Sequence, residues 1–74
     1  MIKYKVQRDV QGSAFMMDDI QKDIGLMKVI DENGIELKFD KGGLYMDVQN
    51  DAPLEDIMEE FMTRDFTLAW KGNT

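Results

Sequence analysis

The sequence predicts a single α+β domain: a small antiparallel sheet of four to five strands with two helices on one face. Three observations predict it. Apolar and polar residues alternate near both ends of the chain, glycine-containing turns separate further alternating segments in the middle, and two segments carry apolar residues three or four apart. No linker or repeat divides the 74 residues, so one domain is expected. A chain this short buries only about 60% of the surface that its unfolded form exposes, so we expect a homodimer to complete the burial.

The first third of the chain is expected to contain one strand and one helix. Residues 2–8 alternate apolar and polar side chains, as a half-buried strand does, and residues 11–13 (Gln-Gly-Ser) end that strand. Residues 16–24 carry methionine and isoleucine four apart, with aspartates in the first turn. Gly25 follows as a plausible C-cap, which predicts a short helix.

From residue 26 the apolar period is two, which predicts a meander of three strands at the centre of the sheet. The loop Glu32-Asn33-Gly34 is expected to join the first two strands, and a two-residue turn at Gly42-Gly43 the last two. The second turn opposes Lys38 to Asp47 on the polar face. Both turns place the apolar side chains of the meander on one face: Met27, Val29, Ile35, Leu37, Phe39, Met46 and Val48.

The last third is expected to contain the second helix and a closing strand. Asp51-Ala52-Pro53 opens the helix, with Asp51 as its N-cap. Residues 66–70 alternate apolar and polar side chains and predict the strand, and residues 72–74 are expected to fray. The apolar residues of the helix form a full amphipathic stripe: Leu54, Ile57, Met58, Phe61 and Met62.

The chain contains neither cysteine nor histidine, which removes several classes of chemistry. Disulfides, thiolate metal sites and a thiol nucleophile are excluded, and the commonest general base and metal ligand is missing. The turns at 31–34 and 40–43 do not keep the ligand spacing of a calcium loop. We therefore expect no enzymatic activity, no metal and no cofactor. The N-terminal segment has no apolar run typical of a signal peptide or membrane span, so we expect a cytoplasmic protein without membrane contact.

Nine basic residues against fifteen acidic ones give a net charge of −6. Such a chain is repelled by phosphate backbones, so direct nucleic-acid binding is not expected, whereas basic surfaces attract it. Residues 47–65 contain seven acidic residues and one basic residue and so account for the whole net charge. In the second helix, Glu55/Glu59 and Asp56/Glu60 are like-charged pairs at i,i+4, and each costs a few tenths of a kcal/mol. Stability alone does not select such a face.

These carboxylates predict a surface for a basic partner. Successive turns of a helix place them about 6 Å apart along the axis, which resembles the spacing of backbone phosphates closely enough for a DNA-binding groove to accept them. The alternative is that the negative charge serves only solubility, with the early acids favouring the helix dipole. The residues expected to bind the partner are Asp47, Asp51, Glu55, Asp56, Glu59 and Glu60.

In its size, its acidity and the helix Pro-Leu-Glu-Asp-Ile-Met-Glu-Glu-Phe at 53–61, the chain resembles the small acidic proteins with which bacteriophages inhibit the host DNA polymerase sliding clamp. The resemblance implies a phage-encoded DNA mimic that acts as a dimer in the DNA channel of the clamp, in the host cytoplasm. It implies that the helix carboxylates meet the basic inner surface of that channel. Two alternatives stay open. One is an acidic antitoxin or immunity-type inhibitor of a basic toxin or nuclease, and the other is a non-catalytic accessory or structural subunit.

Overall fold

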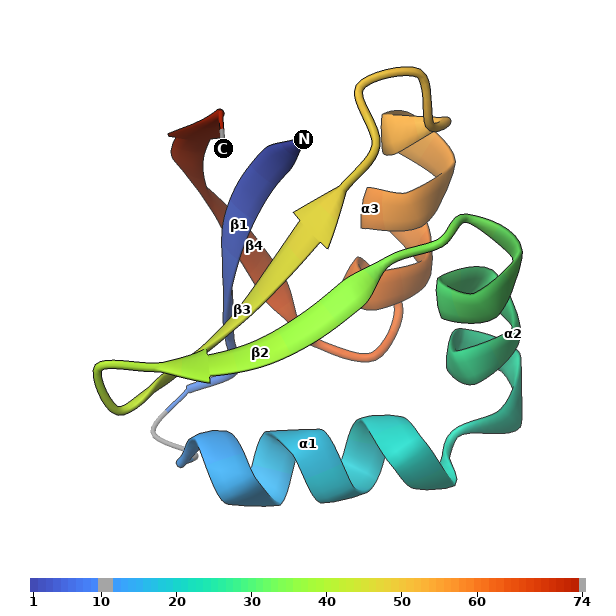
Figure 1. The fold of residues 1–74 in the computed structure, drawn as a ribbon. Coiled ribbons are helices and arrows are strands. Elements are labelled where there is room, and N and C mark those ends of the chain that lie inside the picture. Colours follow the sequence, from blue (N-terminus) through green and yellow to red (C-terminus); the bar gives the residue numbers. More distant parts are fainter. Residues whose placement is uncertain (10–11, 74) are drawn as a thin grey trace.

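The computed structural model describes residues 1–9 and 12–73, and these form four strands and three helices (Figure 1). The predicted α+β class and the four-to-five-stranded antiparallel sheet are confirmed, with one helix more than expected. The elements in chain order are β1 (Ile2–Gln7), α1 (Ser13–Lys22), α2 (Ile24–Glu32), β2 (Glu36–Asp40), β3 (Gly43–Val48), α3 (Leu54–Met62) and β4 (Thr67–Asn73).

The strands form one sheet in the order β2-β3-β1-β4, and all neighbours are antiparallel. β3 therefore lies between β1 and β2, and β1 lies between β3 and β4. Helices make both crossovers, α1 and α2 from β1 to β2, and α3 from β3 to β4. This is the double split β-α-β connectivity of ferredoxin-like domains, with a helix pair in the first crossover. The connectivity by itself indicates no function.

The core lies between the sheet and the helices, which gather on one side of it (Figure 1). Alternation along β1 and β3 places three apolar cross-strand pairs on that side, Ile2–Val48, Tyr4–Met46 and Val6–Leu44. Each helix adds two fully or almost fully buried side chains spaced four apart, and Phe66 adds another just before β4. The helical contributions are Met16 and Ile20, Leu26 and Ile30, and Ile57 and Phe61.

The expected helix over 16–24 is wrong at both ends, because α1 starts and ends earlier than predicted. Asp23 then adopts an extended conformation (φ −90°, ψ 103°) and the chain enters α2 directly. The Asp23 carboxylate accepts a hydrogen bond from the backbone N–H of Leu26 at 3.0 Å, so it caps α2. An N-capping aspartate therefore separates the helices, and Gly25, predicted as a C-cap, lies in the first turn of α2.

The first strand of the predicted meander is also wrong, because residues 27–29 belong to α2. The buried side chains of this segment are Leu26 and Ile30, four apart, rather than an alternating set. Gly34 has φ +59°, the left-handed conformation in which a glycine commonly ends a helix. It therefore ends a helix here instead of turning a hairpin.

The β2–β3 hairpin is confirmed, with its turn one residue earlier than expected. Asp40 pairs with Gly43, so the turn residues are Lys41 and Gly42, both at positive φ (48° and 76°), as in a type I′ turn. The shift moves the register by two residues, which keeps every side chain on its predicted face. Lys38 consequently lies opposite Tyr45.

The closing strand is confirmed and is longer than predicted. β4 continues to Asn73, which pairs with Ile2, so residues 72 and 73 belong to the sheet instead of fraying. Residue 74 of the predicted tail and residue 11 of the predicted break at 11–13 lie outside the described residues.

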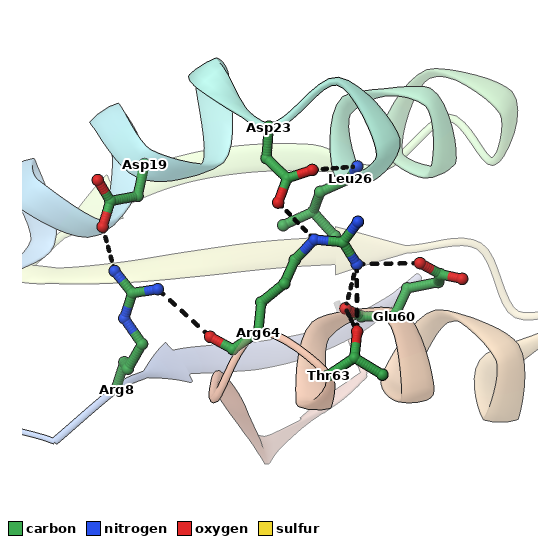
Figure 2. Close-up of polar contacts among 7 residues, drawn as sticks. All are labelled: Arg8, Asp19, Asp23, Leu26, Glu60, Thr63 and Arg64. Carbon is green, nitrogen blue, oxygen red and sulfur yellow. Dashed lines mark hydrogen bonds and ion pairs between the residues drawn. The ribbon is translucent and has the colours of Figure 1, made fainter.

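Two arginines join the helices to each other and to the ends of the strands (Figure 2). Arg64 donates from Nε to the Asp23 carboxylate, and from Nη1 to Glu60 Oε2 (3.0 Å) and the Glu60 carbonyl (2.7 Å). Arg8 donates to the Asp19 carboxylate and to the Arg64 carbonyl (3.3 Å). We call these five residues the arginine clamp. It ties the α1–α2 junction to the end of α3 and to the end of β1.

Replacing Asp23 with asparagine keeps an N-cap residue but removes the ion pair, and should lower the free energy of unfolding by about 1 kcal/mol near neutral pH. The hydrogen bonds from Arg64 and from the Leu26 amide lower the pKa of the Asp23 carboxyl on folding. Its contribution is therefore present above the pKa of the unfolded chain, about 3.9, and is lost as the pH falls through the lower folded value. Urea unfolding of both proteins at several pH values should show the difference shrinking below about pH 4. If the difference in the free energy of unfolding stayed the same at acidic pH, the Asp23 carboxylate would not be its source.

Gly25 lies next to Arg64 of the arginine clamp, and a methyl group added to this glycine would come within 2.7 Å of Arg64 Nη2. Alanine for glycine inside a helix normally stabilises by up to about 1 kcal/mol. Here Gly25→Ala should destabilise, because the guanidinium must leave its carboxylates. In an Arg64→Gln background the same change should become neutral or stabilising. A double-mutant cycle by urea unfolding measures the coupling, expected at about 1 kcal/mol. Additive effects of the two substitutions on the free energy of unfolding would show that the position of the Arg64 guanidinium does not depend on a glycine at residue 25.

Candidate functional site

Helix α3 carries most of the predicted site, and its inner face fixes its orientation. Ile57 and Phe61 are buried, and the Phe61 ring meets Phe66 edge to face at 6.0 Å between centroids. Glu55 and Asp56 occupy the first turn, where negative charge favours the helix dipole. The predicted N-cap at Asp51 is wrong, because Pro53 holds that position and no side chain caps the helix.

The outer face of α3 presents three of the predicted carboxylates to solvent. At about 100° per residue, Glu55, Asp56 and Glu59 point away from the buried side, and all three are exposed. Asp51 is exposed in the turn before the helix. Among the described residues, none of these four carboxylates forms an ion pair. We call Asp51, Glu55, Asp56 and Glu59 the acidic α3 surface.

Glu60 does not belong to this surface. It is half-buried on the flank of α3 that meets the α1–α2 junction, and its carboxylate is paired with Arg64 in the arginine clamp (Figure 2). Glu60 was expected among the solvent-facing carboxylates, and the structure instead places it in an ion pair within the chain. The i,i+4 spacing of Glu60 and Arg64 is a known ion-pair spacing, and it is the signal in the sequence that could have assigned this pair.

Asp47 is not part of the acidic α3 surface either, because it lies on β3 and only 5% of the residue is exposed. Its Oδ2 is 2.9 Å from Lys38 Nζ, and this hydrogen bond raises the pKa of Lys38, with a smaller effect from Glu36. Lys3 is its cross-strand partner on β1. Asp47 thus meets Lys38, as the sequence predicted, but diagonally across the hairpin, and it lies buried in this pair instead of in solvent, where a partner contact was expected. The burial of a charge on the face opposite the helices has no signal in the sequence.

An apolar hollow borders the acidic α3 surface. It was not predicted from the sequence, because both of its methionines were counted in the apolar stripe of the second helix. Met62 is 60% exposed, and Met58 is half-buried. Together with Glu55, Glu59 and Thr63 they line a shallow hollow of about 440 Å³ on the flank of α3 away from Glu60. The apolar stripe of the helix contains five residues and is wider than the face that packs on the sheet. That excess width is the feature of the sequence that could have predicted the hollow.

The fold and this surface define a small α+β domain with an acidic helix face. Within residues 1–9 and 12–73, no cluster of three or more acidic side chains is arranged to hold a metal ion. None of the helices in that part of the chain has the length and apolar character needed to cross a membrane. Comparison with protein-family models, with curated proteins and with solved structures finds no match to this chain.

Proposed function

We propose that the protein is a non-catalytic binding domain that docks its acidic α3 surface on a basic surface of another protein. The observation that carries this proposal is the set of exposed carboxylates without ion pairs on α3. α1, by contrast, pairs Asp18 with Lys22 and Asp19 with Arg8. The segment Leu54–Met62 contains four acidic residues and no basic residue, although opposite charges at i,i+4 would stabilise the helix.

The particular function that we propose is inhibition of a host DNA-processing protein by a phage-encoded DNA mimic, with the replicative sliding clamp as the target. A DNA channel is lined by cations, and a fixed row of carboxylates is attracted to it at long range. Glu55 and Glu59 are one helical turn apart, about 6 Å along the axis. Asp51 extends the negative charge beyond the start of the helix. Exclusion of DNA follows from occupation of the channel and needs no chemical step.

The methionine hollow favours a second candidate. It places apolar atoms of Met58 and Met62 beside Glu55 and Glu59, which suits a protein surface that has apolar side chains among its cations. An antitoxin or immunity-type inhibitor of a basic toxin or nuclease meets such a surface. A mimic of the phosphate backbone uses the carboxylates and has no need of the methionines.

Neutralising α3 in the triple variant Glu55→Gln, Asp56→Asn and Glu59→Gln should weaken binding to a purified bacterial sliding clamp by about tenfold or more. The matched control is Asp9→Asn, Asp31→Asn and Asp65→Asn, which changes net charge equally at exposed carboxylates without ion pairs elsewhere. Asn tolerates the positive φ of Asp9 and Asp65. Calorimetry should show wild-type affinity falling with added salt and the control staying near wild type.

Equal losses in the two triple variants would mean that net charge, and not the α3 surface, drives association. Absence of binding by the wild type would exclude the clamp as the target.

Met62→Gln separates the two candidate functions at an exposed position where the change costs little stability. For the proposed clamp inhibitor, the affinity should stay within about twofold of wild type, since the charges supply the attraction. A loss of about tenfold, measured by the same calorimetry, would favour a partner that inserts apolar groups into the hollow.

A further inference from the structure

The outer edge of β4 is a feature that docking through α3 leaves unused. β4 ends the sheet, and within the described residues its only strand neighbour is β1. An edge strand presents a row of unpaired backbone N–H and C=O groups, and soluble proteins usually protect such an edge with charge, shortness or a bulge.

The two edges of this sheet differ in their protection. β2 is five residues long and carries a charge at every second position, Glu36, Lys38 and Asp40. β4 is seven residues long and carries one charge, Lys71. Its bulge comes late: Trp70 pairs with Tyr4 and Gly72 with Lys3, so Lys71 is the extra residue, next to Gly72 at φ +110°. Residues 67–70 are therefore a regular open edge that ends at the bulge.

β4 also carries an incompletely buried apolar row. Trp70 pairs with Tyr4 and Leu68 with Val6, which places both on the helix-covered side of the sheet. Tyr4 and Val6 are buried there, yet Leu68 is half-buried and Trp70 is 66% exposed. The apolar layer therefore continues to the edge of the sheet and ends in solvent.

We propose that β4 pairs antiparallel with β4 of a second copy of this chain, which joins two four-stranded sheets into one of eight strands. A two-fold axis normal to the sheet keeps the helices of both copies on one side. Each residue must therefore pair with a residue whose side chain points to the same face of the sheet. Centring the axis on Ala69 pairs Leu68 with Trp70 of the second copy and Thr67 with Lys71. This register places the smallest side chain of residues 67–71 on the axis and sets the bulge residue Lys71 at each end of the pairing.

The distribution of charge makes this edge the part of the surface where a second copy meets the least repulsion. Each copy carries −6, so two copies repel each other over most of their surfaces. β4 contains no acidic residue, and it is an edge at which the backbones can approach without bringing carboxylates together. One pair of strands with a few apolar contacts is a small interface, so the dimer should dissociate in the micromolar range. The dimer is independent of the function proposed for α3.

The first test compares Trp70→Lys with Phe39→Lys by sedimentation equilibrium. Phe39 lies on the other edge strand, faces the same side of the sheet and is 58% exposed, so it is the matched control. We expect a concentration-dependent wild-type dimer, a dissociation constant raised about 30-fold or more by Trp70→Lys, and little change with Phe39→Lys. A monomeric wild type, or equal effects of the two changes, would overturn the proposal.

The second test reads the register with single cysteines, which the chain lacks naturally. Ala69→Cys places two thiols across the axis at a Cα separation of about 4.5–5.5 Å, within disulfide range. Thr67→Cys is the control, because its copies lie four residues apart, about 13 Å. Mild oxidation should link Ala69→Cys and leave Thr67→Cys unlinked. Faster linkage of Thr67→Cys alone would exclude this register.

Discussion

The placement of α3 depends on the guanidinium of Arg64. It contacts the cap of α2 through Asp23 and the last turn of α3 through Glu60, and Arg8 binds the Arg64 carbonyl from the end of β1. Gly25 leaves the space that the guanidinium occupies. Together with the burial of Ile57 and Phe61, this contact fixes the rotation of α3 about its axis, since one flank must face the α1–α2 junction. The flank that turns away then holds the methionines and the carboxylates without ion pairs.

The distribution of ion pairs explains why the excess negative charge gathers on one helix. On the face of the sheet opposite the helices, Lys38 neutralises Asp47, and Lys3 lies 3.5 Å from Asp40 and over the Tyr45 ring. α1 and α2 pair acids with their own lysines or with an arginine. α3 receives a single cation, Arg64, at one flank. Most of its charge therefore has no ion pair among the described residues, and the cost in helix stability is a few tenths of a kcal/mol per like-charged pair.

The sequence predicted the parts of the structure that depend on local periodicity. β1, the β2–β3 hairpin, α3 and β4 follow from alternation and from the i,i+3/i,i+4 stripe, and helical spacing also placed Glu55, Asp56 and Glu59 in solvent. The failures occur where one residue suits two structures. Gly34 can end a helix or turn a hairpin, since both need positive φ, and the short apolar run before it satisfies either period. The burial of Asp47 and the pairing of Arg64 with Asp23, 41 residues away, arise only in three dimensions.

The central position of β1 has a consequence for synthesis of the chain. Ile2 pairs with Val48 on one side and with Asn73 on the other. β1 is therefore synthesised before either of the two strands with which it pairs. Local elements, the two consecutive helices and the tight hairpin, form within microseconds, whereas closure over such separations is slower. A nascent chain therefore carries β1 with an unpaired backbone edge and completes its sheet only after β4 has emerged.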